Sequence, residues 1–151
     1  ETKYDNVFKM TSDTMFQLFP QPAFDLIFID GLHHADQVKR DFENSLRCLS
    51  DNGFIVIHDV LPENEAGTIV PRETKQWWGD VWKFAFTVVD YRLHFITYDI
   101  DNGCMVIQNK PIGWNADEFV KLPTPLPEIL DWNYYTNNKQ RRLRITTTVE
   151  I

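Results

Sequence analysis

Two short apolar runs, separated by a stretch with helical periodicity, dominate the pattern of the chain. Residues 24–29 and 54–57 are almost wholly apolar, which favours buried strands of a parallel sheet that is covered on both faces. Between them, apolar residues recur at steps of three and four with charged residues in the gaps, which predicts an amphipathic helix over 35–49. Residues 51–53 predict a turn before the second run. The pattern therefore predicts a β-α-β unit with a central strand at 24–29.

The segments on either side of this unit have weaker patterns. Residues 6–10 predict a short strand, and residues 11–18 predict a short helix with a polar cap at its start. Residues 61–72 lack periodicity and predict a surface loop over the strand ends, of the kind that often acts as a lid. Residues 73–86 place three tryptophans at helical spacing, which predicts a helix whose tryptophans pack against the sheet. Stacking of one of these tryptophans on a ligand is the alternative.

The C-terminal half predicts a hairpin followed by irregular chain. Residues 94–98 and 104–107 predict two antiparallel strands, with Gly103 relieving a positive φ in the turn. Prolines then interrupt the pattern, residues 126–133 predict at most a short helix, and the basic residues 139–144 predict a solvated tail. We therefore expect an α/β domain over residues 1–110 and an irregular extension over residues 111–151 that packs on it or trails from it.

Composition and charge limit the classes of partner. With 43% hydrophobic residues among 151, the chain can bury a core. The formal net charge of −7 argues against nucleic acid and membrane partners, including a nucleic-acid role for residues 139–144. Cys48 and Cys104 lack Cys-x-x-Cys spacing and are expected to be reduced core thiols. There is no signal-peptide pattern and no apolar run of about 18 residues, so a cytoplasmic protein is the simplest expectation.

Acid and imidazole groups follow both of the buried runs. Asp30 and His33 come after the first run, and His58 and Asp59 end the second. Because the carboxyl ends of neighbouring parallel strands line one crevice, we expect these side chains to converge on a single site. The alternative is that each of them only satisfies loop amides.

Four segments together resemble the class I S-adenosylmethionine-dependent methyltransferases: residues 11–13, 24–33, 41–46 and 55–60. The resemblance runs from about Asn6 to Gln108 and is greatest to the subgroup with Ile-Asp-Gly-x-His at its fourth strand and His-Asp at its fifth. It implies an α/β, Rossmann-like sheet in the order 3-2-1-4-5-7-6, mostly parallel with a C-terminal antiparallel hairpin. Residues 6–10 would be the third strand, the two apolar runs the fourth and fifth, and the hairpin the sixth and seventh.

The resemblance implies that S-adenosylmethionine is the cofactor. Ser12 and Asp13 would contact its adenine, because in such enzymes the residues after the third strand do so. Asp30 would lie beside the methionine portion of the cofactor and the acceptor. Ser12, Asp13 and Asp30 are therefore the expected cofactor-binding residues.

The similar metal-dependent O-methyltransferases imply further roles. In them an Asp after the fourth strand and a polar pair after the fifth hold a divalent cation such as Mg²⁺, which implies Asp30, His58 and Asp59 as metal ligands here. A basic residue three positions after that Asp removes the acceptor proton, and His33 stands at this position. Imidazole titrates near the operating pH and suits the task. His33 and Asp30 are therefore the expected catalytic residues.

The chain also departs from that family. The Gly-rich loop after the first strand and the acidic ribose-binding residue after the second have no counterpart, since all six glycines lie from Gly31 onward. The family usually has Lys in place of His33 and Asp-Asn in place of His58-Asp59. The chain thus corresponds to the C-terminal two-thirds of such an enzyme and is expected to be incomplete at its N-terminus. The absent strands would leave an open edge at 24–29, which either pairs with residues 1–10 or, as we prefer, joins a second copy as a homodimer.

These observations leave two functions open. The first is methyl transfer from S-adenosylmethionine to a small-molecule acceptor, with O-methylation preferred, by this chain or by an enzyme of which it is a fragment. The second is a catalytically inactive, methyltransferase-like module for binding or assembly. The retained acid and imidazole groups favour the first function, and the absent Gly-rich loop favours the second.

Overall fold

A computed structural model describes residues 7–19, 21–111 and 126–147. Its elements follow in the order α1 (Ser12–Leu18), β1 (Phe24–Ile29), α2 (Ala35–Cys48), β2 (Leu49–Ile57), the 3₁₀ turn η1 (Ala66–Thr68), α3 (Val81–Ala85), the 3₁₀ turn η2 (Val88–Tyr91), β3 (Leu93–Tyr98), β4 (Cys104–Pro111), α4 (Trp132–Leu143) and β5 (Ile145–Thr146). The expected β-α-β unit is therefore present as β1, α2 and β2. The expected hairpin is present as β3 and β4.

The strands form one mixed sheet in the order β1-β2-β4-β3-β5. β1 pairs with β2 in parallel, β4 is antiparallel to both β2 and β3, and β5 is parallel to β3. The mostly parallel sheet with an antiparallel hairpin member confirms the expected Rossmann-like α/β fold. The order β1-β2-β4-β3 is also the 4-5-7-6 half of the expected strand order.

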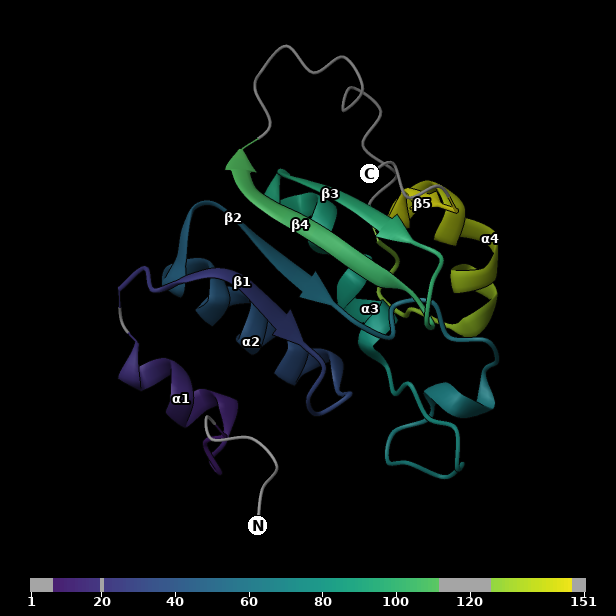
Figure 1. Ribbon diagram of the computed structural model, residues 1–151. Coiled ribbons are helices and arrows are strands. Elements are labelled where there is room, and N and C mark those ends of the chain that lie inside the picture. Colours follow the sequence, from purple (N-terminus) through teal and green to yellow (C-terminus); the bar gives the residue numbers. More distant parts are fainter. Residues whose placement is uncertain (1–6, 20, 112–125, 148–151) are drawn as a thin grey trace.

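Helices α2 and α3 lie together on one face of the sheet, and α4 lies beside its β5 edge (Figure 1). The apolar stripe of α2 supplies Val38 and Phe42, which are 3% and 0% exposed, and the sheet supplies Ile55 and Ile57, which are fully buried. Each fully buried side chain of this size contributes roughly 1.5–3 kcal/mol relative to an exposed one. This core holds the carboxyl ends of β1 and β2 in fixed positions.

The N-terminal expectations are met only in part. α1 begins where the sequence predicts it, and the Thr11 hydroxyl caps it by accepting from the backbone N–H of Thr14 at 3.2 Å. Residues 7–10 form no strand, so the expected strand at 6–10 is wrong for its described part, and Asn6 lies outside the described residues. A strand exists only with a ladder partner, and residues 7–10 have none within the described chain.

Strand β1 lies at the edge of the sheet, which corrects the expectation of a central strand covered on both faces. It pairs only with β2 among the described strands. Leu26 and Phe28 alternate with the inward-facing Ile27 and Ile29 and are 61% and 56% exposed. Pairing of residues 1–10 with this edge is not seen for residues 7–10, and residues 1–6 lie outside the described part.

The expected turn at 51–53 is instead part of β2. The register passes from Phe24 opposite Leu49 to Leu26 opposite Phe54, so β2 carries extra residues in an irregularity of the ladder. Asn52 takes a φ of 63°, which a short polar side chain tolerates. β2 begins at Leu49, directly after α2, so residues 51–53 lie within the strand. They form a bulge there instead of a turn before it.

The expected helix at 73–86 is wrong over most of its length. Only Val81–Ala85 is α-helical, and the break comes at Gly79, whose φ of +60° is incompatible with a right-handed helix. Trp78 and Trp82 are buried, as predicted for tryptophans that pack in the core. Trp77 is only partly buried, and its ring stacks on His33.

The basic residues 139–144 are not a solvated tail. Most of them lie on α4, which begins at Trp132 after the Asp131 cap, so the short helix expected at 126–133 starts later and runs further. Leu143 and Tyr135 are fully buried and Arg142 is 4% exposed, with its Nε donating to the Tyr134 hydroxyl at 3.1 Å. The basic residues of this helix therefore lie next to buried side chains, Tyr135 and Leu143, that pack on the core. The domain division at residue 110 stays a prediction.

Two further expectations concern the cysteines and the membrane. Cys48 and Cys104 are free thiols, the first buried and the second partly buried. Among the helices of the described segments, none is both long enough and apolar enough to cross a bilayer.

Candidate active site

The four polar side chains at the strand ends converge, as the sequence predicts. β1 delivers Asp30 and His33 and β2 delivers His58 and Asp59, and the backbone N–H of His58 donates to the carbonyl of Ile29 at 3.1 Å. This hydrogen bond continues the β1–β2 register past the end of the strands. It thereby places the two pairs side by side.

Each imidazole of the cluster lies between two carboxylates. Asp30 Oδ1 is 3.3 Å from Nε2 of His33 and 3.2 Å from Nδ1 of His58. Asp59 reaches the same two rings, with Oδ2 at 3.2 Å from Nδ1 of His33 and Oδ1 at 3.3 Å from Nδ1 of His58. The arrangement can therefore accept, store and pass on protons.

Asp59 is the most buried member of the cluster. Its side chain is 7% exposed and its φ is 60°, an unusual backbone conformation for a non-glycine residue that turns the chain as β2 ends. Burial raises the pKa of the Asp59 carboxyl, and the imidazoles of His58 and His33 offset part of that effect. A strained backbone and a perturbed carboxyl at a strand end are features of functional sites.

His58 is held in its charged form more readily than a free imidazole. Burial lowers its pKa, but the carboxylates of Asp59 and Asp30 outweigh burial, so the pKa is raised above its ordinary value. Its Nε2 is buried without a hydrogen bond and lies 3.3 Å from Oδ2 of Asp101 in the β3–β4 turn. The positive charge of His58 therefore faces carboxylates on both sides.

The cluster opens into a cavity of about 400 Å³. The cavity is lined by the four strand-end residues together with Gln76, Trp77, Trp78 and Asn102. Sequence reasoning missed Gln76 and Asn102 as site residues, and it considered the tryptophans only as an alternative to core packing. The loop predicted at 61–72 extends to residue 80 and lies at the strand ends (Figure 1), so the helical spacing of the tryptophans concealed the part of it that lines the cavity.

A second cavity of about 320 Å³ lies between α1 and the end of β1. It is lined mostly by apolar side chains, with the polar groups of Ser12, Asp30 and Asp41 among them. Asp30 lines both cavities and stands where they meet. Of the expected cofactor residues, Ser12 and Asp30 line this cavity, whereas Asp13 lies nearby with Oδ1 at 3.8 Å from Arg40.

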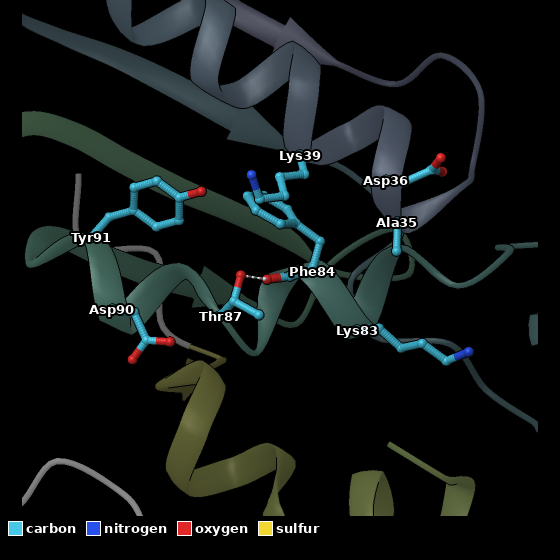
Figure 2. Close-up of a pocket in the computed structure, with 8 residues that line it drawn as sticks. All are labelled: Ala35, Asp36, Lys39, Lys83, Phe84, Thr87, Asp90 and Tyr91. Atoms are coloured by element: carbon cyan, nitrogen blue, oxygen red, sulfur yellow. Dashed lines mark hydrogen bonds between the residues drawn. The ribbon is translucent and has the colours of Figure 1, made fainter. Parts of the chain in front are cut away.

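A groove of about 480 Å³ between α2 and the α3–η2 segment is larger than these two cavities, but none of the four strand-end residues lines it (Figure 2). Three of its polar side chains are engaged within the protein: Lys39 and the Tyr91 hydroxyl donate to Glu43 at 2.5 and 2.8 Å, and the Thr87 hydroxyl donates to the Phe84 carbonyl at 2.7 Å. Burial and the contact with Glu43 raise the pKa of Tyr91 to about 12. We therefore place the candidate site at the strand ends and not in this groove.

The strand-end cluster also offers metal ligands. One ligand atom each from Asp30, His33 and Asp59 lies within 4.8 Å of the other two. The expected set of Asp30, His58 and Asp59 shares two of these residues, and His58 approaches both carboxylates. Carboxylate oxygens suit Mg²⁺ or Mn²⁺, and imidazole widens the choice to other divalent ions.

Comparison with known families agrees with the geometry. Residues 1–60 match a methyltransferase domain family. The matched segment spans α1, β1, α2 and β2 and includes the whole strand-end cluster. Together with the sheet order, the match supports a class I S-adenosylmethionine-dependent methyltransferase.

Proposed function

We propose that the strand-end cluster is the site of methyl transfer from S-adenosylmethionine to a hydroxyl group of a small-molecule acceptor. The observation that carries the proposal is the position of Asp30, which lines the apolar cavity beside α1 and the polar cavity beside the imidazoles. A donor in the first cavity and an acceptor in the second would meet at this residue. Methyl transfer needs such a meeting, because the reacting atoms must be held in line.

His33 is the proposed general base. Its Nε2 faces Asp30 and the polar cavity, and Asp30 Oδ1 at 3.3 Å stabilises the positive charge that the ring gains with the proton. The acceptor O–H bond breaks as its proton moves to Nε2, and the oxygen forms a bond to the methyl carbon. With S-adenosylmethionine bound, the bond from that carbon to sulfur would break at the same time and the donor would leave as a neutral thioether.

Ser12 and Asp30 are the proposed cofactor contacts, with Asp13, the neighbour of Ser12 on α1, as a further candidate. The cavity fits such a ligand in part, since it joins an apolar lining to a hydroxyl and a carboxylate. When bound, the cofactor supplies a methyl group on a cationic sulfonium. The Asp30 carboxylate favours that positive charge next to the acceptor.

Asp30, His58 and Asp59 are the proposed ligands of a divalent cation such as Mg²⁺. A bound cation would lower the pKa of the acceptor hydroxyl and hold it against His33. Ligation by His33 itself would use up its lone pair, so the base and ligand roles of His33 exclude one another. Removal of metal by chelator followed by Mg²⁺ add-back should abolish and restore transfer.

One observation favours a second function, that of an inactive binding or assembly module. Residues 1–23 contain no glycine, so this segment itself supplies no Gly-rich turn before β1. Backbone approach to a nucleotide at such a turn requires glycine. This alternative predicts binding without turnover.

We also propose a homodimer that forms through the open edge of β1. That edge carries Leu26 and Phe28 in exposed positions and has Asp25 as its only charged side chain, which accepts from Ser50 at 2.6 Å. Edge strands usually carry charged residues or proline, which prevent association with other strands. β1 has one charged residue and no proline. A second copy offers the same strand, apolar apart from Asp25, and is self-complementary.

A methyl-transfer assay tests the proposed function. The protein is supplied with methyl-labelled S-adenosylmethionine at millimolar concentration, Mg²⁺ and panels of hydroxylated and amine acceptors, and the products are analysed by mass spectrometry. We expect labelled methyl ethers that require His33. Methylated amines alone would contradict O-methylation, and no product at any donor concentration would favour the binding module.

A further inference from the structure

The loop between β2 and α3 is tied to His33 by contacts from several directions. The carbonyl oxygen of His33 accepts from the backbone N–H of Asp80 at 3.2 Å, and the Asp80 carboxylate accepts from the N–H of Ala35 at 2.7 Å. A Cβ on Gly79 would overlap the His33 carbonyl. The loop therefore binds the backbone at His33 and at Ala35, where α2 begins.

Trp77 brings the same loop against the His33 ring. The two rings are stacked, with centroids 5.4 Å apart and planes inclined by 18°. The indole is itself fixed, because its Nε1 donates to the Ile69 carbonyl at 2.7 Å and the Arg72 guanidinium lies 5.9 Å from the ring centroid. The His33 ring thus stacks on an indole ring whose rotation is restricted by its own hydrogen bond.

The backbone of Trp77 makes a further contact that bears on the protonation of His33. Its carbonyl oxygen lies 3.3 Å from Nδ1 of His33, and Asp59 Oδ2 lies 3.2 Å from the same atom. A carbonyl oxygen can only accept, so Nδ1 faces two acceptors, whereas Nε2 faces one, the Asp30 oxygen at 3.3 Å. The Trp77 carbonyl therefore shifts the balance toward the neutral tautomer with the proton on Nδ1. The lone pair is then on Nε2, the nitrogen that faces Asp30 and the polar cavity.

We propose that Trp77 is a positioning residue that sets the ring plane and the tautomer of His33. The inference rests on the proposed role of His33 as general base, since only an unprotonated Nε2 can receive the acceptor proton. The indole stack fixes the ring plane, and the carbonyl of the same residue holds the proton on Nδ1. The loop that covers the strand ends thereby prepares the base as well as lining the cavity.

Nitrogen NMR of the imidazoles tests the proposal on the full chain without donor or acceptor. The protein is labelled with ¹⁵N-histidine and studied at a pH where the rings are neutral, and His33 is assigned with a His33→Gln variant. We expect Nδ1 of His33 to be protonated and Nε2 to be unprotonated. Trp77→Leu keeps the backbone carbonyl but frees the His33 ring to turn away from it, so it should give a mixture of tautomers. Trp77→Phe, which keeps an aromatic face, should keep the tautomer of the parent protein.

A matched control removes a stack elsewhere. Trp132 stacks on Tyr135 with centroids 4.8 Å apart, so Trp132→Leu should leave the His33 signals unchanged. An unchanged tautomer in Trp77→Leu would overturn the proposal. Loss of the tautomer in both Trp77 variants would assign the effect to the Ile69 hydrogen bond and would also overturn the stacking role. The expected NMR result without methyl transfer in the assay above would leave the positioning role standing and remove the proposed function.

Discussion

Residues 24–60 and residues 61–80 line the same cavity, but only the first segment is built from regular elements that a sheet and its helix fix in place. In the first segment, register and packing decide where Asp30, His58 and Asp59 lie. In the second, shape comes from contacts with His33 and from glycines at tight positions. The difference teaches that the sheet determines which groups meet, while the loop determines how one of them is oriented.

The largest expected effect tests the role of the regular segment. Replacing His33 by Ala should lower kcat roughly a hundredfold or more with little change in cofactor affinity, because a positioned base contributes about that much. Steady-state kinetics on any acceptor found in the panel measures it. His94→Ala is the matched control, since His94 is exposed on β3 and outside the cluster. Unchanged turnover in His33→Ala would remove His33 from the mechanism.

The next effect tests how the loop is held. Gly79→Ala should destabilise the protein by about 2 kcal/mol or more, because the residue has a φ of +60° and its new Cβ would meet the His33 carbonyl. Urea unfolding provides the measurement. Gly31→Ala is the control, since a Cβ there would have nothing within 4 Å, and it should change stability by no more than about 0.5 kcal/mol. Equal stability of the two variants would show that the loop is not anchored at Gly79.

A third effect concerns the open edge of the regular segment. If two copies join at β1, Phe28→Lys should shift the protein from dimer toward its 17.8 kDa monomer, because a charge on this edge opposes strand pairing. Light scattering after size exclusion reports the mass. Ile129→Lys changes an apolar side chain that is 76% exposed and lies outside β1, and it should leave the mass unchanged. A monomeric parent protein would defeat the dimer proposal.

The smallest effect is a pH dependence of stability that arises from His58. Its folded pKa is raised above the ordinary 6.5, so the folded state binds this proton more tightly than the unfolded state. The stabilisation is therefore complete below about pH 6.5 and is lost as the pH rises through the raised pKa. Urea unfolding of metal-free protein between pH 6 and 9 should show this fall in the parent protein and in His94→Asn, but not in His58→Asn. A fall of equal size in all three proteins would contradict the assignment.

Much of the regular segment could be predicted because its signals are local. Apolar periodicity marks α2, and the two apolar runs mark β1 and β2, so the convergence of Asp30, His33, His58 and Asp59 follows from parallel pairing alone. The edge position of β1 could not be predicted in the same way. An apolar run shows that a strand favours burial, but the neighbours that cover it are set by the rest of the sheet.

The loop and the C-terminal helix were harder to predict for a different reason. Trp77 sits in a tryptophan-rich stretch with helical spacing, but its ring stacks on His33 and is held by the Ile69 carbonyl instead of packing in the core. On α4, basic residues surround Leu143 and Arg142, which are buried through tertiary packing that charge alone does not reveal. In both cases the position of the side chain depends on contacts with segments that are distant in the sequence, which local patterns do not reveal.

The most direct test of the central claim is to locate S-adenosylmethionine binding by NMR titration of the ¹⁵N-labelled chain. We expect residues 1–151 to bind more weakly than low micromolar, because residues 1–23 contain no glycine for a Gly-rich turn before β1, with chemical-shift changes centred on Ser12, Asp30 and Gly31. Asp30→Asn should reduce these changes. Changes confined to the groove between Lys39 and Tyr91, or none at millimolar cofactor, would contradict the claim that the strand ends form a methyl-transfer site.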